Sequence, residues 1–187
     1  RPIRASNLVE SADGGYARMS ELIEFREAKD EFFKGDHHSP LTPDQQSGFR
    51  GLSYYDENPS LKLELKPKQL EKPELIEMQT STGAVAKYLR WATIAFEVDH
   101  EPAQLTLYKD VGDDDFFLPF TDATSGKETY PAGRYLETHA LQNGNVLIDF
   151  DYAYNPYCAY NEQWSCPLTP FENRLQVPIR AGEKIFE

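Results

Sequence analysis

The chain has little of what membrane proteins and nucleic-acid-binding proteins require. Its 187 residues include no apolar run long enough to span a bilayer. It has 19 basic residues against 31 acidic ones and a formal net charge of −12, so its surface repels phosphate backbones and anionic lipid. We therefore expect no nucleic-acid and no membrane partner. The acidic surplus is interpreted mainly as a source of solubility, with a cationic partner or metal as the functional alternative.

Glycosylation acceptors are also absent, because no N-x-[ST] sequence occurs in which x is a residue other than proline. This absence favours a cytoplasmic location. The chain begins with Arg1 rather than methionine, so a cleaved signal peptide or a missing N-terminus is compatible with the sequence as well.

Cysteine is scarce: there are two, Cys158 and Cys166, eight positions apart. Three interpretations compete, namely a reduced buried pair, a disulfide and part of a metal site. A disulfide would close a short loop and stabilise the fold by roughly 2.5 kcal/mol. Zinc sites need C-x2-4-C spacing or nearby histidine pairs, which are missing here, so we expect structural cysteines, no metal and no cofactor. Cys158 as a nucleophile would need an oriented base, and every histidine is distant in sequence.

The organisation of the chain is simple, with no internal repeat, no low-complexity tract and no long linker. We predict a loosely ordered arm over residues 1–15 and a single globular β-rich domain over 16–187. Residues 16–34 show an apolar stripe at helical spacing, which predicts a helix ended by Gly35. Thr42 and Gln45 flank a proline in a capping box, which predicts a second, short helix.

Period-two alternation then predicts several strands. The expected strands are 61–65, 74–79, 87–98, 103–109 and a last one near 175–180, with 99–102 as a hairpin turn. The fold class that follows is mainly β (α+β), an antiparallel bent sheet or partial barrel with an N-terminal helix packed on it.

The strongest local signal is Asn143-Gly144 between residues 135–141 and 146–152. Asn-Gly is the favoured two-residue hairpin turn, so paired residues should have numbers that sum to 287. Both faces of this hairpin then mix apolar and ionisable residues, which indicates strands covered on both sides. Asp149 and Asp151 would share one side of a strand. There they could bind a cation, act as acid and base, or form a structural pair bonded to backbone amides or to Arg134. The structural pair is favoured, because buried ionisable groups are more often paired than catalytic.

Two other motifs resemble ligand loops but lack the required residues. The acidic run from Asp110 to Asp115 lacks the alternating ligands of a calcium loop and is interpreted as a turn. The run from Ser125 to Thr129 lacks the first glycine of a phosphate loop, and Glu128 stands where that loop has its magnesium-binding hydroxyl.

We expect a ligand site where turn-rich segments flank this hairpin. Arg134 would bind an anionic group of a small molecule, Asp149 and Glu128 would orient it, and Tyr152 and Tyr154 would form walls. The full candidate set is Asp122, Glu128, Arg134, Asp149, Tyr152 and Tyr154. The alternative is a non-enzymatic structural or protein-interaction module in which these residues form an internal polar network. The sequence does not distinguish binding from catalysis, and it gives no signal of oligomeric state.

Three phrases carry a family resemblance: HSPLT…FRGLSYY, PFTDATSGKETYPAGRYLE and DFDYAYNPYCAYNEQWSCPLTPFENRLQVPIRAGEK. From about residue 20 onward the chain resembles the uncharacterised family called domain of unknown function 1684. The resemblance implies a single-domain protein of a type found in bacteria and archaea, and it implies no activity. The family phrase usually reads D-F-N where this chain has Asp149-Phe150-Asp151, which argues against an obligatory carboxylate pair.

Overall fold

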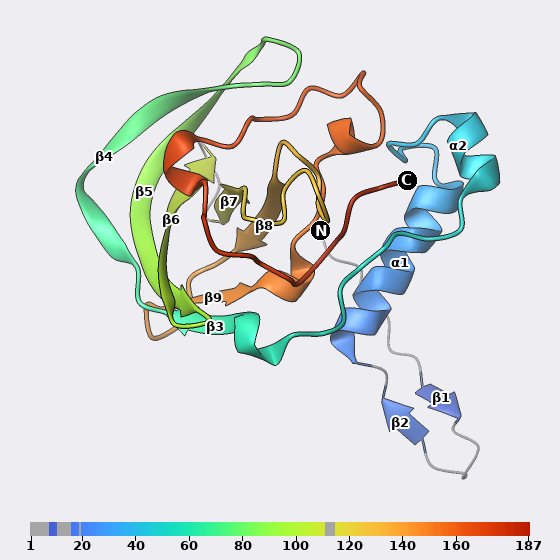
Figure 1. The fold of residues 1–187 in the computed structure, drawn as a ribbon, viewed down its shortest axis with the longest axis horizontal. Coiled ribbons are helices and arrows are strands. Elements are labelled where there is room, and N and C mark those ends of the chain that lie inside the picture. The colour runs from blue at the N-terminus through green and yellow to red at the C-terminus, as the bar shows by residue number, and fades with distance from the viewer. Residues whose placement is uncertain (1–7, 11–15, 19, 111–114) are drawn as a thin grey trace. The chain divides into compact units, whose positions relative to one another are not determined.

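The computed structural model describes residues 8–10, 16–18, 20–110 and 115–187 (Figure 1). The chain divides into two compact units, residues 1–51 and residues 52–187, and each is described by itself. Most of the acidic run from Asp110 to Asp115 lies outside the described residues. Within the described ranges no helix has both the length and the apolar character needed to cross a membrane.

The first unit contains a small hairpin and two helices. Strands β1 (Leu8–Glu10) and β2 (Tyr16–Arg18) pair antiparallel. Helix α1 spans Glu21–Gly35, where Ser20 caps its first turn by accepting a hydrogen bond from the Ile23 N–H at 3.3 Å. The prediction of a helix from residue 16 was wrong for its first turn, because 16–18 form a strand and the cap is at Ser20. The expected loose arm concerns residues that, apart from 8–10, are not described.

Helix α2 spans Pro43–Gly48 and has the predicted capping box. The Gln45 N–H donates to the Thr42 hydroxyl at 3.3 Å, and the Thr42 N–H donates to the Gln45 side-chain oxygen at 2.8 Å. Both groups would otherwise be unpaired at a helix start, which explains why this short helix could be predicted from four residues.

The second unit is built on a five-stranded antiparallel sheet in which sequence neighbours are also spatial neighbours. Its strands are β4 (Lys68–Gln79), β5 (Val85–Val98), β6 (Glu101–Asp110), β7 (Phe116–Phe120) and β8 (Arg134–Thr138). A separate pair joins β3 (Lys62–Leu65) to β9 (Val146–Asp149). The predicted class, a mainly β chain with an antiparallel sheet and an N-terminal helix, is confirmed; the sheet stays open and does not close into a barrel.

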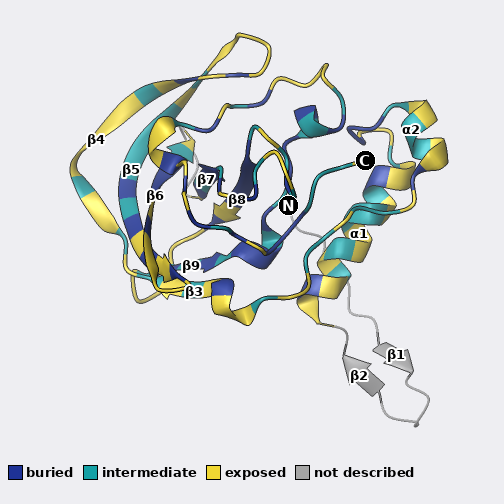
Figure 2. Cartoon of the chain, viewed as in Figure 1, coloured by how far each residue is buried: buried dark blue, intermediate teal, exposed yellow. Residues whose placement is uncertain are grey.

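The core lies between the sheet and the C-terminal segment. Short 3-10 helices punctuate the second unit: η1 (Pro59–Leu61), η2 (Phe150–Tyr152), η3 (Tyr157–Ala159) and η4 (Phe171–Asn173). Leu175, Val177 and Ile179 alternate into the same core as the strand residues. The predicted strand at 175–180 was nevertheless wrong, since this segment is not in a strand and is attached by single contacts such as Leu175 N–H to Thr121 O at 2.8 Å. Figure 2 shows the buried interior beside the largely exposed strand β4.

The predicted hairpin register was wrong by one residue at the turn. The Leu141 N–H donates to Asn145 O at 2.7 Å and the Gly144 N–H donates to Leu141 O at 2.9 Å, so the loop has three residues rather than two. Gly144 has φ of 81°, the left-handed residue that such a loop requires. Ala140 therefore faces Val146, and beyond this bridge β9 pairs with β3 instead of continuing the hairpin.

Candidate functional site

Arg134, the predicted anion-binding residue, lies at the centre of a buried network. Its side chain is 1% exposed, and it pairs with Asp122, also 1% exposed, at 3.0 Å. It donates further hydrogen bonds to the backbone carbonyls of Ala181, Glu183 and Ile179, the last two at 3.1 and 2.7 Å. The arginine thus connects strand β8 to the C-terminal segment.

Asp122 is held as firmly as its partner. One carboxylate oxygen accepts from the Thr124 N–H at 2.7 Å, the Thr124 hydroxyl at 2.6 Å and the Ile179 N–H at 3.3 Å. Burial lowers the pKa of Arg134, and the Asp122 charge opposes that shift. A guanidinium remains charged under such conditions, so the structure holds a paired, hydrogen-bonded charge in its interior. A ligand could reach Arg134 only by displacing protein groups.

Glu128 lies in a separate, more exposed cluster. Its carboxylate accepts hydrogen bonds from Nε and an Nη of Arg180, at 3.2 and 2.9 Å, and from the Tyr55 hydroxyl at 2.9 Å. These hydrogen bonds lower the pKa of Glu128, with Arg180 the largest cause. Burial, followed by the bond to Glu128, raises the pKa of Tyr55 to about 12.

Asp149, Tyr152 and Tyr154 occupy further separate positions. Asp149 ends β9, forms an ion pair with Lys62 at 3.0 Å and caps η2. Because the chain turns into η2 there, the prediction that Asp149 and Asp151 share one side of a strand was wrong. Tyr152 packs against the main core, while the Tyr154 hydroxyl donates to Glu137 at 2.9 Å. Of the six predicted residues, Asp122 and Arg134 are joined by a direct side-chain bond.

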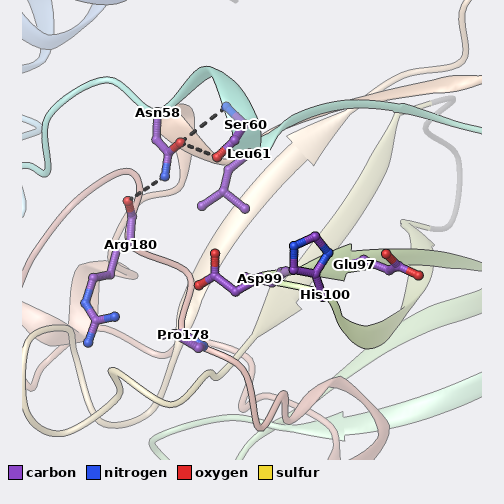
Figure 3. Close-up of a pocket in the computed structure, with 9 residues that line it drawn as sticks. Asn58, Ser60, Leu61, Glu97, Asp99, His100, Pro178 and Arg180 are labelled. Carbon is purple, nitrogen blue, oxygen red and sulfur yellow. Dashed lines mark hydrogen bonds between the residues drawn. The ribbon is translucent and has the colours of Figure 1, made fainter.

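A pocket of about 480 Å³ lies elsewhere in the second unit (Figure 3). Three segments distant in sequence form it: the turn around η1, the end of β5 with its hairpin turn, and the C-terminal segment. Its lining comprises Asn58, Ser60, Leu61, Glu97, Val98, Asp99, His100, Pro178 and Arg180. Leu61 and Val98 are buried, whereas Asp99 and His100 are exposed. The volume is within the range of small-molecule sites.

The pocket includes an unusual turn. Strands β5 and β6 are joined by Asp99-His100 alone, with φ of 51° and 68°. This is the left-handed pair that tight hairpins need and that glycine and asparagine usually supply. The turn predicted from the sequence, 99–102, is longer than the two residues that join the strands. The pocket itself was missed, although a two-residue turn without glycine between two long strands was the signal that could have indicated it.

Two polar residues of the pocket, Asn58 and Arg180, are fixed by neighbouring contacts. The Asn58 amide donates to Arg180 O at 3.4 Å, and the Asn58 N–H donates to Asp151 at 2.9 Å. The Arg180 guanidinium is held by Glu128, as described above. The Asp99 and Glu97 side chains point in opposite directions, and in the described ranges neither carboxylate forms an ion pair.

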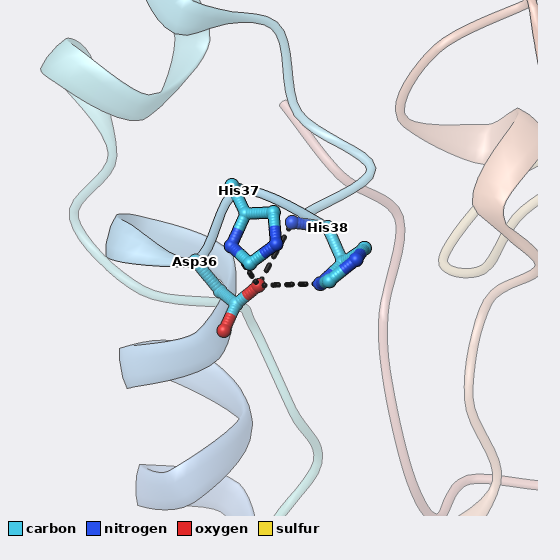
Figure 4. A group of neighbouring side chains, drawn as sticks. All are labelled: Asp36, His37 and His38. Atoms are coloured by element: carbon cyan, nitrogen blue, oxygen red, sulfur yellow. Dashed lines mark hydrogen bonds and ion pairs between the residues drawn. The ribbon is translucent and has the colours of Figure 1, made fainter.

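The first unit contains a group of possible metal ligands just after α1 (Figure 4). His37 Nδ1 and His38 Nδ1 lie 3.5 and 3.2 Å from the same carboxylate oxygen of Asp36. That oxygen also accepts the His38 N–H at 2.8 Å, the largest cause of the lowered pKa of Asp36. The three side chains therefore already form a hydrogen-bonded surface turn. The two histidines are largely exposed, and among the described residues no further ligand joins the group, so we assign no site to it.

The fold and its pocket define the second unit as an open antiparallel β-sheet domain. The buried hydrogen bonds of Arg134 connect its sheet to the C-terminal segment. The chain belongs to the family described as "Protein of unknown function (DUF1684)", whose model matches residues 47–184. This confirms the family resemblance of its sequence phrases. It is also similar to the solution structure of an uncharacterised protein from gene locus rrnAC0354 of Haloarcula marismortui. The two share 36% identity over 88% of this chain and 92% of the other, with a TM-score of 0.69. No curated protein matches the chain.

Proposed function

We propose that the second unit is a small-molecule-binding domain whose site is the pocket at Asp99, and that its ligand carries a cationic group such as a primary amine or guanidinium. The observation that carries the proposal is the pocket of about 480 Å³ whose wall includes two non-glycine residues held in left-handed backbone. Residues kept in such conformations cluster at ligand sites, since the strain persists only where the surroundings enforce it.

The charges of the pocket support a cationic rather than an anionic ligand. The Arg180 guanidinium is engaged by two bonds to Glu128, so its charge is already matched. The carboxylates of Glu97 and Asp99 have no such partner among the described residues. Leu61, Val98 and Pro178 would contact the apolar body of a ligand while Asp99 binds its charged end.

A thermal-shift and calorimetric screen tests this proposal. The probes are agmatine, putrescine and arginine methyl ester, with succinate and inorganic phosphate as anionic counterparts. We expect a cationic probe to raise the Tm and Asp99→Asn to abolish that effect. Glu101→Gln is the matched control, because Glu101 is an exposed carboxylate beside the same turn but does not line the pocket. The proposal fails if cationic probes have no effect, or if Asp99→Asn leaves their effect unchanged.

The same screen tests the sequence-based expectation of an anionic ligand at Arg134. Succinate or phosphate that raises the Tm equally in the wild type and in Asp99→Asn would support that expectation over the cationic site.

A second candidate is the non-enzymatic structural or interaction module. It is favoured by the Asp122–Arg134 pair, in which the guanidinium already donates to one carboxylate and three backbone carbonyls. On this alternative no probe of either charge raises the Tm, and replacing Arg134 changes stability alone.

A further inference from the structure

The two cysteines of the second unit face each other across a short loop. Cys158 lies in η3, and its N–H donates to the Cys166 sulfur at 3.4 Å. Both cysteine side chains belong to one buried cluster. Both are free thiols, exposed by 9% and 8%. Two neighbouring cysteines, rather than a lone thiol, are therefore built into this part of the fold.

The backbone on each side of the pair is fixed by other contacts. Cys166 is attached to the tip of the β4–β5 hairpin, since its N–H donates to the Ser81 hydroxyl at 3.1 Å and its carbonyl accepts the Ser81 N–H at 2.8 Å. The Leu168 N–H continues this attachment to Gln79 O at 2.8 Å. On the other side η3 is closed by the Ala159 N–H to Pro156 O bond at 2.9 Å. The sulfurs are thus held together by anchors that do not depend on a covalent bond.

The surroundings make the two thiols chemically different. Hydrogen bonds from Cys166 first, and also from the Tyr130 hydroxyl, lower the pKa of the Cys158 thiol in spite of burial. The Tyr130 hydroxyl lies 3.9 Å from that sulfur. The same contact between the thiols raises the pKa of Cys166. The Tyr130 hydroxyl therefore favours negative charge on the Cys158 sulfur, and Cys166 is the neighbouring thiol.

Aromatic rings surround the pair. Tyr135 belongs to the same buried cluster, and Phe117, Tyr130, Tyr154 and Tyr157 pack against it. Tyr157 in turn meets Trp164 edge to face, with ring centroids 5.1 Å apart. Because both residues are less than a tenth exposed, a small electrophile should reach them more readily than a bulky one.

We propose that Cys158 and Cys166 form a peroxide-reactive dithiol site, in which Cys158 attacks hydrogen peroxide and Cys166 completes a reversible disulfide. The Cys158 thiolate attacks one peroxide oxygen, the O–O bond breaks, and the other oxygen leaves as hydroxide and takes up a proton to become water. Cys158 is now a sulfenic acid. The Cys166 sulfur then attacks the Cys158 sulfur, its proton leaves with the hydroxyl as a second water, and the S–S bond forms. In sum, two thiols and one peroxide give one disulfide and two waters, with sulfur oxidised and peroxide reduced.

The test is titration of the whole chain with hydrogen peroxide, followed by thiol counting, intact mass and non-reducing electrophoresis. We expect both thiols to disappear together, with a mass loss of about 2 Da for the two hydrogens. The product should remain a monomeric band, and dithiothreitol should restore both thiols. The proposal is overturned if both thiols stay free at peroxide concentrations that oxidise a free low-pKa thiol, or if the product is a disulfide between chains.

Single variants assign the two roles. In Cys166→Ser the reaction should stop at a Cys158 sulfenic acid that dimedone labels. In Cys158→Ser, Cys166 should react many-fold more slowly than Cys158 does in the wild type. Equal labelling of the lone cysteine in both variants would contradict the assignment.

Tyr130→Phe provides a readout that a purely structural role would not change. It removes the hydroxyl that donates to Cys158 and keeps the ring, so the pH profile of Cys158 alkylation should move to higher pH while the Tm is retained. An unchanged profile would remove Tyr130 from the site. If a serine variant fails to fold, the wild-type titration and the Tyr130→Phe profile still decide the proposal.

Discussion

Replacing Arg134 with methionine should be among the most damaging single changes in the second unit. The guanidinium is almost fully buried and donates to Ala181 O, Glu183 O, Ile179 O and the Asp122 carboxylate. Methionine has a similar length and no donor, so the change removes these bonds without opening a large cavity.

The cost can be estimated from the partners left behind. Three buried carbonyls without a donor cost about 1 kcal/mol each at the low end of the usual range. A buried carboxylate that loses its counter-charge costs about 3–5 kcal/mol, reduced here because Asp122 keeps its bonds to Thr124 and Ile179. Since these contributions overlap, we expect a loss of about 5 kcal/mol, which is a third or more of the stability of an ordinary domain.

The assay is urea unfolding followed by tryptophan fluorescence. Arg180→Met is the matched control, since it removes an ion pair whose side chains are 56% and 38% exposed and should cost about 1 kcal/mol or less. Arg134→Lys keeps the charge but not the planar set of donors, so we expect about half the loss of unfolding free energy. This variant replaces Arg134→Met in the comparison if the methionine variant does not fold. A loss for Arg134→Met no larger than that for Arg180→Met would refute the argument that the network stabilises the fold.

Three further changes test other parts of the structure. Gly182→Ala should cost more than about 2 kcal/mol, because at φ of +75° a Cβ would lie 2.6 and 2.7 Å from two backbone carbonyl oxygens. The control is Gly83→Ala, which has φ of +82° but open space around the Cβ position and should cost about 1 kcal/mol. Similar urea midpoints for the two variants would contradict the steric argument. His100→Gly should stabilise the second unit by up to about 1 kcal/mol by relieving the left-handed turn, and a lower midpoint would refute strain there. Burial is the largest single influence on the Glu172 pKa and raises it, but the hydrogen bonds to the carboxylate, that from Tyr108 first, together lower the pKa below its usual value. Glu172 therefore stabilises the fold above its unfolded pKa of about 4.3 and loses that contribution as pH falls through its lower folded value; Glu172→Gln should flatten the fall in unfolding free energy between neutral and acid pH, and an unchanged slope would exclude this role.

Local chemistry made several elements predictable. The capping box around α2 places each hydrogen-bonding group within three residues of its partner, so four residues of sequence suffice. Alternation likewise identified β3 and the long β5–β6 hairpin, because the burial of successive side chains on opposite faces depends on the strand itself.

The errors arose where distant segments compete for the same partner. Asn143-Gly144 predicted a tight turn, but the strand that follows pairs with β3, and the turn takes a three-residue loop that suits this arrangement. The alternation of Leu175, Val177 and Ile179 correctly indicates burial. It does not indicate a strand, because a segment can bury alternate residues while its backbone bonds to scattered loop atoms.

The sequence by itself determined the class of this protein, namely its mainly β character, its family and its acidic charge. It also singled out the turn-rich segment around Arg134 and the two cysteines as the place of the candidate residues. These properties follow from residue composition and near-neighbour patterns. Only the tertiary structure decided that Arg134 binds backbone carbonyls of the C-terminal segment, that Cys158 and Cys166 are in contact, and that Asp99 lines a pocket with Asn58 and Pro178. Each of these facts depends on which distant segments share one core, and the energy that decides it is the joint burial of many side chains rather than any local preference.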